Sequence, residues 1–318
     1  MSLWIDSLLA VLAVFLAVRC LLAPTLPQCV FLFFAFGLTL ALAWARLGAV
    51  DVAIAEAAIA AGFLGVLLID ALRDFSRSRS TGEGGDRPSR VSQGLVGAGV
   101  LVFLVVAIEA VWRVPNGGGL TALAADNLPQ SGVDHPVTAV LLNYRSYDTW
   151  LEVGVVLMAL LALFATGGRE YFCRPVVRAV DPLLRQVILL FTPVLFLVGA
   201  FLLYLGKTEP GGAFQAAVLW GAGGILLHLG GWPVFASMAP WLRHLLLTAG
   251  FGFFLLLGFL FMAGGGALFE YPLAQAGLLI LVVETLAALS IAAALTAIFA
   301  YFNGMSAESA EPFTPASS

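Results

Sequence analysis

The chain has 318 residues, of which 61% are apolar and only 11% are charged, whereas about 25% of the residues in an ordinary soluble domain are charged. Together with a mean hydropathy of +1.01, this composition excludes a water-soluble globular protein and favours a polytopic helical membrane protein. The formal net charge of −4 offers no basic face, so we expect no nucleic acid among the partners.

Nine apolar stretches are long enough to cross a bilayer as helices, because a span takes about 20 residues. They are expected at residues 3–22, 28–45, 50–72, 94–113, 150–167, 186–205, 212–230, 242–263 and 273–301. The first has the length of a signal peptide, but its start carries Asp6 and neither Lys nor Arg. We therefore expect a retained helix, and the predicted fold class is an all-α transmembrane bundle.

Polar segments divide these spans into groups. The stretch 73–93 is rich in Gly, Ser and Arg and is expected to be a flexible linker, and 168–185 is a second, basic connector. The tail from Asn303 is rich in Ser, Pro and Glu, which predicts disorder. The resulting units are 1–72 with three spans, the linker 73–93, 94–168 with two spans and an outer loop, 169–302 with four spans, and the tail 303–318.

Arginine is concentrated in two of the connecting segments, which predicts the orientation. The segment after the third span holds five Arg residues and the segment after the fifth holds four. With Arg19 and Arg243, one side of the membrane collects 11 of the 15 basic residues. Because basic loops remain in the cytoplasm, we predict an outer N-terminus and a cytoplasmic C-terminus.

Motifs for catalysis are missing from the sequence. Cys20, Cys29 and Cys173 form no CxxC motif and have no spacing with His that suits zinc. No P-loop, GxSxG or HExxH motif is present. We therefore predict no catalytic residue, no metal site and no cofactor, and we expect no ATP hydrolysis by this chain.

Carboxylates within spans are the first candidates for function, because each costs about 2.5–3.5 kcal/mol to insert at mid-bilayer. Glu56 shares one helix face with Ala49, Ala53 and Ala60, a small-residue stripe that lets another helix approach. It fits an ion pathway, or a protonated side chain that only joins two helices. Asp51 opens the same helix and is expected to be its N-cap.

Glu284 lies near the middle of the last predicted span. Gly277, Ala287 and Ala288 give it a small-residue face, and no basic residue stands within a turn of it. An ion-pathway role and a structural hydrogen bond remain open for this residue too.

Glu109 and Glu152 could each belong to an ion path, but each also has a possible partner nearby in the sequence. Arg113 follows Glu109 at i+4, which favours a helical ion pair. Thr149 and Glu152 fit an S/T-x-x-E capping box, although Glu152 and the nearby Asp148 could also form an outer ion entrance.

The connection between the sixth and seventh spans interrupts the apolar pattern with Lys207, Pro210, Gly211 and Gly212. Its composition favours a tight reentrant turn over a binding loop. His228, at the far end of the seventh span, fits an interfacial hydrogen bond better than a proton relay.

Three motifs resemble the Mrp (Mnh) multisubunit Na+/H+ antiporters. The stretch GAVDVAIAEAAIAAGFLGVLL (48–68) resembles the D-type module of the large A subunit, and HPVTAVLLNYRSYDTWLEV (135–153) is similar to the adjoining E-type module. The stretch TPVLFLVGAFLLYLGKTEPGGAFQAAVLWGAGGILL (192–227), with the Glu284 helix, resembles the separate B subunit. The chain departs from the family at Val50 in place of Pro, at Asn143 in place of Asp and at Ala213 in place of Gly.

The resemblance implies a secondary ion-transport subunit, and not an enzyme, in a bacterial inner membrane. It implies the tail of an A subunit fused to a B subunit, without the antiporter-like part that carries membrane lysines. It implies partners, namely other membrane subunits including a large antiporter-like one, together with lipid and Na+ or H+. Glu56 and Glu284 would be the intramembrane carboxylates, with Asp148 and Glu152 near the outer mouth. Two alternatives remain: a module of a redox-driven or carbon-uptake complex, or a scaffold without an ion path.

Overall fold

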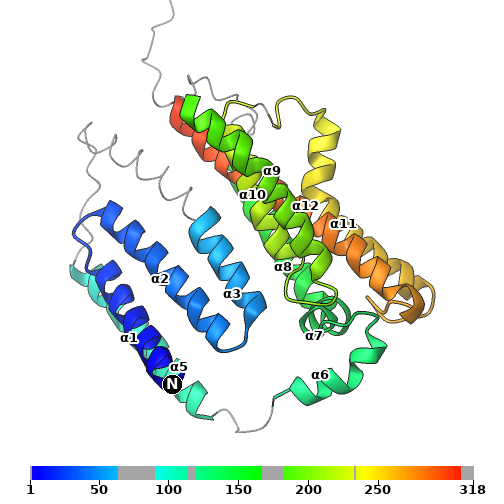
Figure 1. Cartoon of the computed structure of the whole chain (residues 1–318), viewed down its shortest axis with the longest axis horizontal. Helices are drawn as coiled ribbons and strands as arrows, with labels where there is room; N and C mark the ends of the chain where they lie inside the picture. The colour runs from blue at the N-terminus through cyan, green and yellow to red at the C-terminus, as the bar shows by residue number, and fades with distance from the viewer. Residues whose placement is uncertain (1, 64–89, 114–118, 167–181, 233, 309–318) are drawn as a thin grey trace, which may run out of the picture.

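The computed structural model describes residues 2–63, 90–113, 119–166, 182–232 and 234–308, and within these ranges the chain is helical and contains no strand. The elements in chain order are α1 (Ser2–Leu21), α2 (Leu26–Arg46), α3 (Val50–Ala57), the π-helix η1 (Ala58–Phe63), α5 (Arg90–Arg113), α6 (Thr121–Asn127), the 3-10 helix η2 (Leu128–Gln130), α7 (Pro136–Ala139), the π-helix η3 (Val140–Tyr144), α8 (Ser146–Ala165), α9 (Pro182–Leu205), α10 (Ala213–Leu229), α11 (Pro240–Ala263) and α12 (Leu273–Glu308) (Figure 1).

The predicted all-α membrane bundle is confirmed. Among the described residues, six helices are long and apolar enough to cross a membrane, namely α1, α2, α8, α9, α11 and α12. Helix α10 is apolar but shorter, with 17 residues, and α5 has 24 residues over the fourth predicted span. The third predicted span is helical through α3 and η1 up to Phe63, beyond which it lies outside the described residues.

Three polar segments differ from their prediction. Helix α5 begins at Arg90, so the last residues of the predicted linker 73–93 are helical, and α9 begins at Pro182 inside the second connector. Helix α12 continues to Glu308, so the tail is not disordered from Asn303 as expected. Elongating an existing helix adds one hydrogen bond per residue, and Met, Ala and Glu favour that elongation. The other residues of all three segments lie outside the described ranges.

Helices α10 and α12 form the centre of the bundle. Helix α9 and the α3–η1 segment pack on α10, and α8 and α11 pack on α12 (Figure 1). The α10–α12 interface consists of small residues, which allow the backbones to approach closely. They include Ala213, Ala216, Ala217, Ala287 and Ala288, all buried. This interface positions the residues considered below, because one of them lies on α12 beside the first residue of α10.

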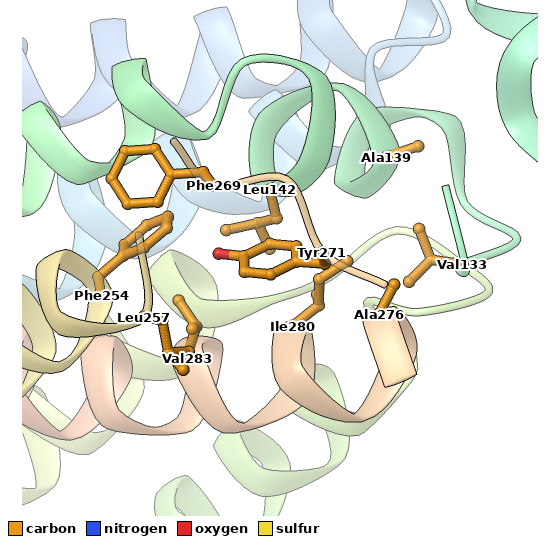
Figure 2. Packing of buried hydrophobic residues seen from close by; sticks show 10 residues of the cluster. All are labelled: Val133, Ala139, Leu142, Phe254, Leu257, Phe269, Tyr271, Ala276, Ile280 and Val283. Carbon is orange, nitrogen blue, oxygen red and sulfur yellow. The ribbon is translucent and has the colours of Figure 1, made fainter. Parts of the chain in front are cut away.

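The segment between α5 and α8 folds over the end of the bundle. Val133, Ala139 and Leu142 from this segment belong to one buried cluster with Phe254 and Leu257 of α11 and with residues of α12 and its preceding connection (Figure 2). This region was predicted only as an outer loop, whereas it contains α6, η2, α7 and η3. The core fixes its position relative to the ends of α9 and α12.

Helices α1 and α2 pair as a hairpin, and α2 packs against α3. Much of this part of the chain is open to its surroundings. In the apolar window of α1 only 6% of the residues are buried, against 56% in α12. Within the described residues, α5 belongs to none of the closely packed helix pairs. These faces are available to lipid or to other proteins.

The crossing of α11 and α12 yields a test with an internal control. A Cβ added at Gly250 would lie 2.8 Å from the Cα of Ala287, whereas one added at Gly252 would meet nothing within 4 Å. We expect Gly250→Ala to destabilise the chain by about 1–3 kcal/mol, because the backbone itself would have to shift. Gly252→Ala should be neutral or stabilising by about 0.5–1 kcal/mol. Thermal denaturation in solubilised membranes measures the difference, and equal melting temperatures for the two variants would contradict the crossing.

Candidate functional site

The connection between α9 and α10 turns back along the end of α9. The N–H groups of Gly206 and Gly212 both donate to the carbonyl oxygen of Leu202, at 3.1 and 2.9 Å. The predicted reentrant turn is therefore present in the structure. Gly212 has φ +115°, a backbone conformation that side-chain-bearing residues rarely adopt. Helix α10 consequently starts beside the last turn of α9 instead of beyond it.

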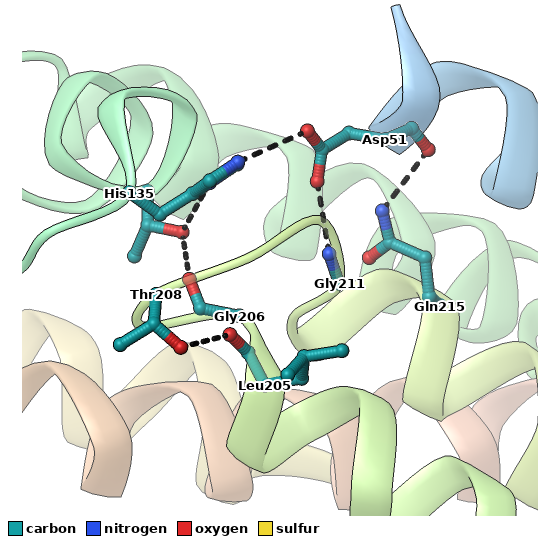
Figure 3. A network of polar contacts seen from close by, with 8 residues as sticks. Asp51, His135, Leu205, Gly206, Thr208, Gly211 and Gln215 are labelled. Carbon is teal, nitrogen blue, oxygen red and sulfur yellow. Dashed lines mark hydrogen bonds and ion pairs between the residues drawn. The ribbon is translucent and has the colours of Figure 1, made fainter. Parts of the chain in front are cut away.

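Asp51 links this turn to α3. One carboxylate oxygen, Oδ1, accepts the N–H of Gly211 at 3.0 Å, and the backbone oxygen of Asp51 accepts Nε2–H of Gln215 at 3.2 Å (Figure 3). The predicted N-cap role is wrong, because α3 is capped at Ala49 and Asp51 lies in its first turn. Its carboxylate serves a backbone donor on the connection before α10 instead of one in its own helix.

His135 joins the same carboxylate from the other side. Its Nε2 lies 3.5 Å from Oδ2 of Asp51 (Figure 3). Its Nδ1 lies 3.4 Å from Oγ1 of Thr138. The Thr138 hydroxyl donates at 2.5 Å to the carbonyl oxygen of Gly206. The backbone N–H of His135 also donates, at 2.9 Å, to the carbonyl oxygen of Lys207. The α9–α10 connection is thus held between α3 and the start of α7.

Glu284 is the buried carboxyl group of the region, only 2% exposed. Its Oε1 accepts the N–H of Ala213, the first residue of α10, at 3.3 Å. Its Oε2 is buried and has no hydrogen-bond partner among the described residues. A helix N-terminus favours a negative charge, and an unpartnered buried oxygen is costly. The site is therefore suited to a bound proton or cation.

The space beside Gly212 connects Glu284 to Gln215. A Cβ added at Gly212 would lie 2.9 Å from Oε1 of Glu284 and 3.7 Å from Oε1 of Gln215. Because the amide nitrogen of Gln215 donates to the backbone oxygen of Asp51, the side-chain oxygen of Gln215 is the atom that faces this space. A polar series therefore runs from His135 through Asp51 and Gln215 to Glu284.

Lys207 lies in a pocket next to this series. The pocket has a volume of about 250 Å³ and is lined by Gly132, Val133, Asp134, Tyr204, Lys207 and Thr208. The Cε atom of Lys207 would lie 3.9 Å from a Cβ added at Gly277 on α12, two turns before Glu284. The amine is close enough to the Glu284 carboxyl to interact with it electrostatically. Within the described residues Lys207 forms no ion pair.

Glu56 lies outside the polar series that leads to Glu284. Its Oε1 would be 3.4 Å from a Cβ added at Gly37 of α2, so the carboxyl packs at the α2–α3 interface, as its small-residue stripe predicts. The buried Ala53 and Ala60 belong to that stripe. The π-helix η1 begins two residues later, and π-helical turns are frequent at functional sites. The structure does not bring Glu56 into contact with Glu284.

The remaining predicted acidic residues are peripheral. Glu109 forms the expected ion pair with Arg113 at 2.5 Å, on an exposed surface. Asp148 pairs with Arg145, and Glu152 is exposed one turn further along α8. The predicted capping box is wrong, because η3 ends at Tyr144 and α8 already begins at Ser146, which places Thr149 and Glu152 inside the helix.

His228 is buried at the end of α10, and no interfacial hydrogen bond is present at its Nε2 within the described residues. Its ring packs edge-on against Phe299 of α12, with ring centroids 6.0 Å apart. It therefore lies at the opposite end of the α10–α12 interface from Glu284. The interface between them is closed by small side chains such as Ala217, Gly221 and Ala292.

Sequence reasoning missed three residues of the site, His135, Thr138 and Gln215. All three are polar residues within the motifs that carry the family resemblance, since His135 and Thr138 belong to HPVTAV and Gln215 ends PGGAFQ. Polar residues in an otherwise apolar chain were the available signal. Their convergence on Asp51 depends on tertiary structure and has no sequence signature.

Comparison with known proteins finds two families along the chain. Residues 11–77 match MbhD, described as the D subunit of MBH. Residues 183–305 match MnhB, described as a domain related to the MnhB subunit of Na+/H+ antiporter. These matches confirm the predicted D-type and B-type modules, while the E-type assignment of 94–168 stays a prediction. No curated protein matches the chain.

Among solved structures, a chain in the structure of the Mrp complex from Dietzia sp. DQ12-45-1b is similar, with a TM-score of 0.72 and 22% sequence identity. The similarity covers 96% of this chain and 35% of the other. The chain thus shares the fold of about a third of that larger protein.

Asp51 gives a test of the cluster. Asp51→Ala leaves the N–H of Gly211 without its acceptor, and we expect a loss of about 1–3 kcal/mol in stability. The control is Asp6→Ala, which removes an exposed ion pair to Arg46 and should cost at most about 1 kcal/mol. Thermal denaturation of the chain in solubilised membranes measures the melting temperatures of the two variants. A melting temperature for Asp51→Ala as high as that of Asp6→Ala would contradict the stabilising role of the Asp51 contacts.

Proposed function

The chain combines a domain of the MbhD family with a domain of the MnhB-related family, and on this basis we propose that it is an integral subunit of an Mrp-type cation/proton antiporter. Its role there is to form part of the ion path in a bacterial inner membrane. The chain itself catalyses no chemical reaction, and its partners are other membrane subunits, including a large antiporter-like one.

The observation that carries the proposal is the placement of Glu284. Its carboxyl group is buried, has one oxygen without a partner among the described residues, and lies at the N-terminus of α10. The polar series that reaches it starts at His135, passes Asp51 in the MbhD-like segment and continues at Gln215 in the MnhB-like segment. The two family domains therefore meet at the candidate site, which supports a shared function.

Exchange follows from the cost of the bare carboxylate. In a membrane interior an uncompensated charge is strongly disfavoured, and either a proton or a cation removes that cost. Only one of the two can neutralise Oε2 of Glu284 at a time. Binding of Na+ at the site then releases H+, and binding of H+ releases Na+. The gradient of one ion can therefore drive the movement of the other.

His135 and Asp51 form the outer part of the path. Both side chains adjoin the connection that leads to Glu284. Transfer of a proton from this pair through water beside Gly212 would supply Glu284.

Partners are needed for the rest of the path. Beyond Glu284 the α10–α12 interface is closed by Ala and Gly, and the chain has one Lys in total. Glu56 packs at the α2–α3 interface, on the open side of the molecule that holds α1 and α5. We propose that Glu56 serves a path formed together with another subunit, and that the membrane potential, about 2.3 kcal/mol per charge per 100 mV, acts through the assembly.

A second candidate is supported by the match of residues 11–77 to MbhD, the D subunit of MBH. The same module would then translocate protons in a redox-driven or carbon-uptake complex. Isolation of the intact complex through a tag on this chain, followed by mass spectrometry, separates the two. Antiporter subunits favour the first candidate, and redox subunits favour the second.

Replacement of Glu284 tests the ion path. In the whole complex, Glu284→Gln removes the exchangeable charge with little change in shape, and we expect Na+-driven pH change in inverted vesicles to fall about tenfold or more, equivalent to about 1.4 kcal/mol or more. Glu56→Gln should reduce it as well. Glu209→Gln, an exposed carboxylate on the same connection, is the matched control and should exchange normally.

A scaffold role predicts a different pattern for these variants. If the glutamates only hold helices together, Gln should be nearly silent while Ala impairs assembly. Undiminished exchange in both Glu284→Gln and Glu56→Gln, at normal assembly, would therefore refute the ion-path proposal.

Gly212 gives a second test of the same site. Gly212→Ala and Gly265→Ala both place a Cβ on a backbone with positive φ, +115° and +93°, so both should cost about 1 kcal/mol of stability. Only the first places a methyl group against Glu284. We expect exchange to be lost in Gly212→Ala and kept in Gly265→Ala, measured per assembled complex. Equal exchange rates in the two variants would show that the space beside Glu284 is not used.

A further inference from the structure

Two thiols meet at the turn between α1 and α2. Cys20 lies in the last turn of α1 and Cys29 in the first turn of α2. Their Sγ atoms are 3.4 Å apart, and Sγ of Cys20 also lies 3.4 Å from the carbonyl oxygen of Cys29. Both are free thiols and both are half-buried. Because a disulfide bond is about 2.05 Å long, a small movement of the two side chains would close it.

A hollow opens at the same α1–α2 turn. It has a volume of about 270 Å³ and is lined by Arg19, Ala23, Pro24, Gln28, Phe31 and Leu32. Arg19 and Gln28 are the chain neighbours of the two cysteines, although the cysteines themselves do not line the hollow. The exposed guanidinium of Arg19 can hold a carboxylate, so this turn suits the approach of a small anionic reagent.

We propose that Cys20 and Cys29 form a reversible disulfide site that reacts with small anionic disulfides of the glutathione type. The thiolate of one cysteine attacks a sulfur of the small disulfide, forms a mixed disulfide and releases one small thiol. The second cysteine then attacks the protein sulfur of that mixed disulfide and releases the other small thiol. The two protein thiols are oxidised by two electrons in total, the small disulfide is reduced, and the protons of the protein thiols pass to the released thiolates.

The predicted orientation sets the resting state. Arg19 belongs to the cytoplasmic side in that orientation, and the cytoplasm keeps thiols reduced. The pair is therefore a dithiol at rest and closes when oxidised small thiols accumulate. Closure fixes the end of the α1–α2 hairpin, and α2 carries Gly37 against Glu56. The proposal itself stands on the thiol geometry and does not depend on the ion-path proposal.

Thiol counting in membranes that contain the whole complex tests the site. The membranes are treated with glutathione disulfide, free thiols are blocked with a small maleimide, and thiols freed by a reductant are then labelled with a polyethylene-glycol maleimide. We expect the oxidised chain to gain two labels together, and Cys173→Ser to behave in the same way. Cys20→Ser and Cys29→Ser should each lose this two-label band.

Mass spectrometry on the wild-type chain provides a second measurement that needs no variant. A disulfide-linked peptide pair containing Cys20 and Cys29 is the expected product of oxidation. The proposal is overturned if excess glutathione disulfide leaves both residues as free thiols, if each only keeps a separate mixed disulfide, or if the two-label band depends on Cys173.

Discussion

A carboxyl group inside a membrane has to be neutralised, and this requirement organises the centre of the molecule. Glu284 is 2% exposed on α12, in a region where a bare charge is costly. The fold supplies one N–H, from the start of α10, and leaves the second oxygen without a partner among the described residues. Partial neutralisation of this kind suits an exchangeable ion better than a permanent structural bond, because a structural carboxyl would normally have all its partners.

The surrounding architecture brings the start of α10 to that carboxyl. The α9–α10 connection turns back on Leu202, Gly212 adopts a positive φ, and the Ala-rich interface lets α10 approach α12 closely. The same connection is held from outside by Asp51 and by His135. Residues from the MbhD-like segment, the intervening segment and the MnhB-like segment thus meet around a turn of a few residues. The contacts of Asp51 with Gly211, Gln215 and His135 hold these segments together at that turn.

Sequence alone could predict the helices, because about 20 apolar residues in a row leave few alternatives, and it could single out Glu284 because a carboxylate in such a run is rare. It could not assign Asp51, which has the position expected of a helix cap but accepts the N–H of Gly211, 160 residues away in the chain. It also misassigned Thr149 and Glu152, whose capping-box spacing falls inside α8 because that helix already begins at Ser146 after its N-cap Arg145. The spacing of residues in the sequence predicts partners within the same helix, whereas the polar residues discussed here are paired mainly by tertiary structure.

The central claim is that Na+ and H+ compete for the carboxyl group of Glu284. Infrared difference spectroscopy of the purified complex, recorded while Na+ replaces a large inert cation at constant pH, observes this directly. The account predicts that Na+ removes a carbonyl band of a protonated carboxyl group, and that this difference band is missing in Glu284→Gln but retained in Glu209→Gln. A band that does not respond to Na+, or one that persists at full amplitude in Glu284→Gln, would contradict it.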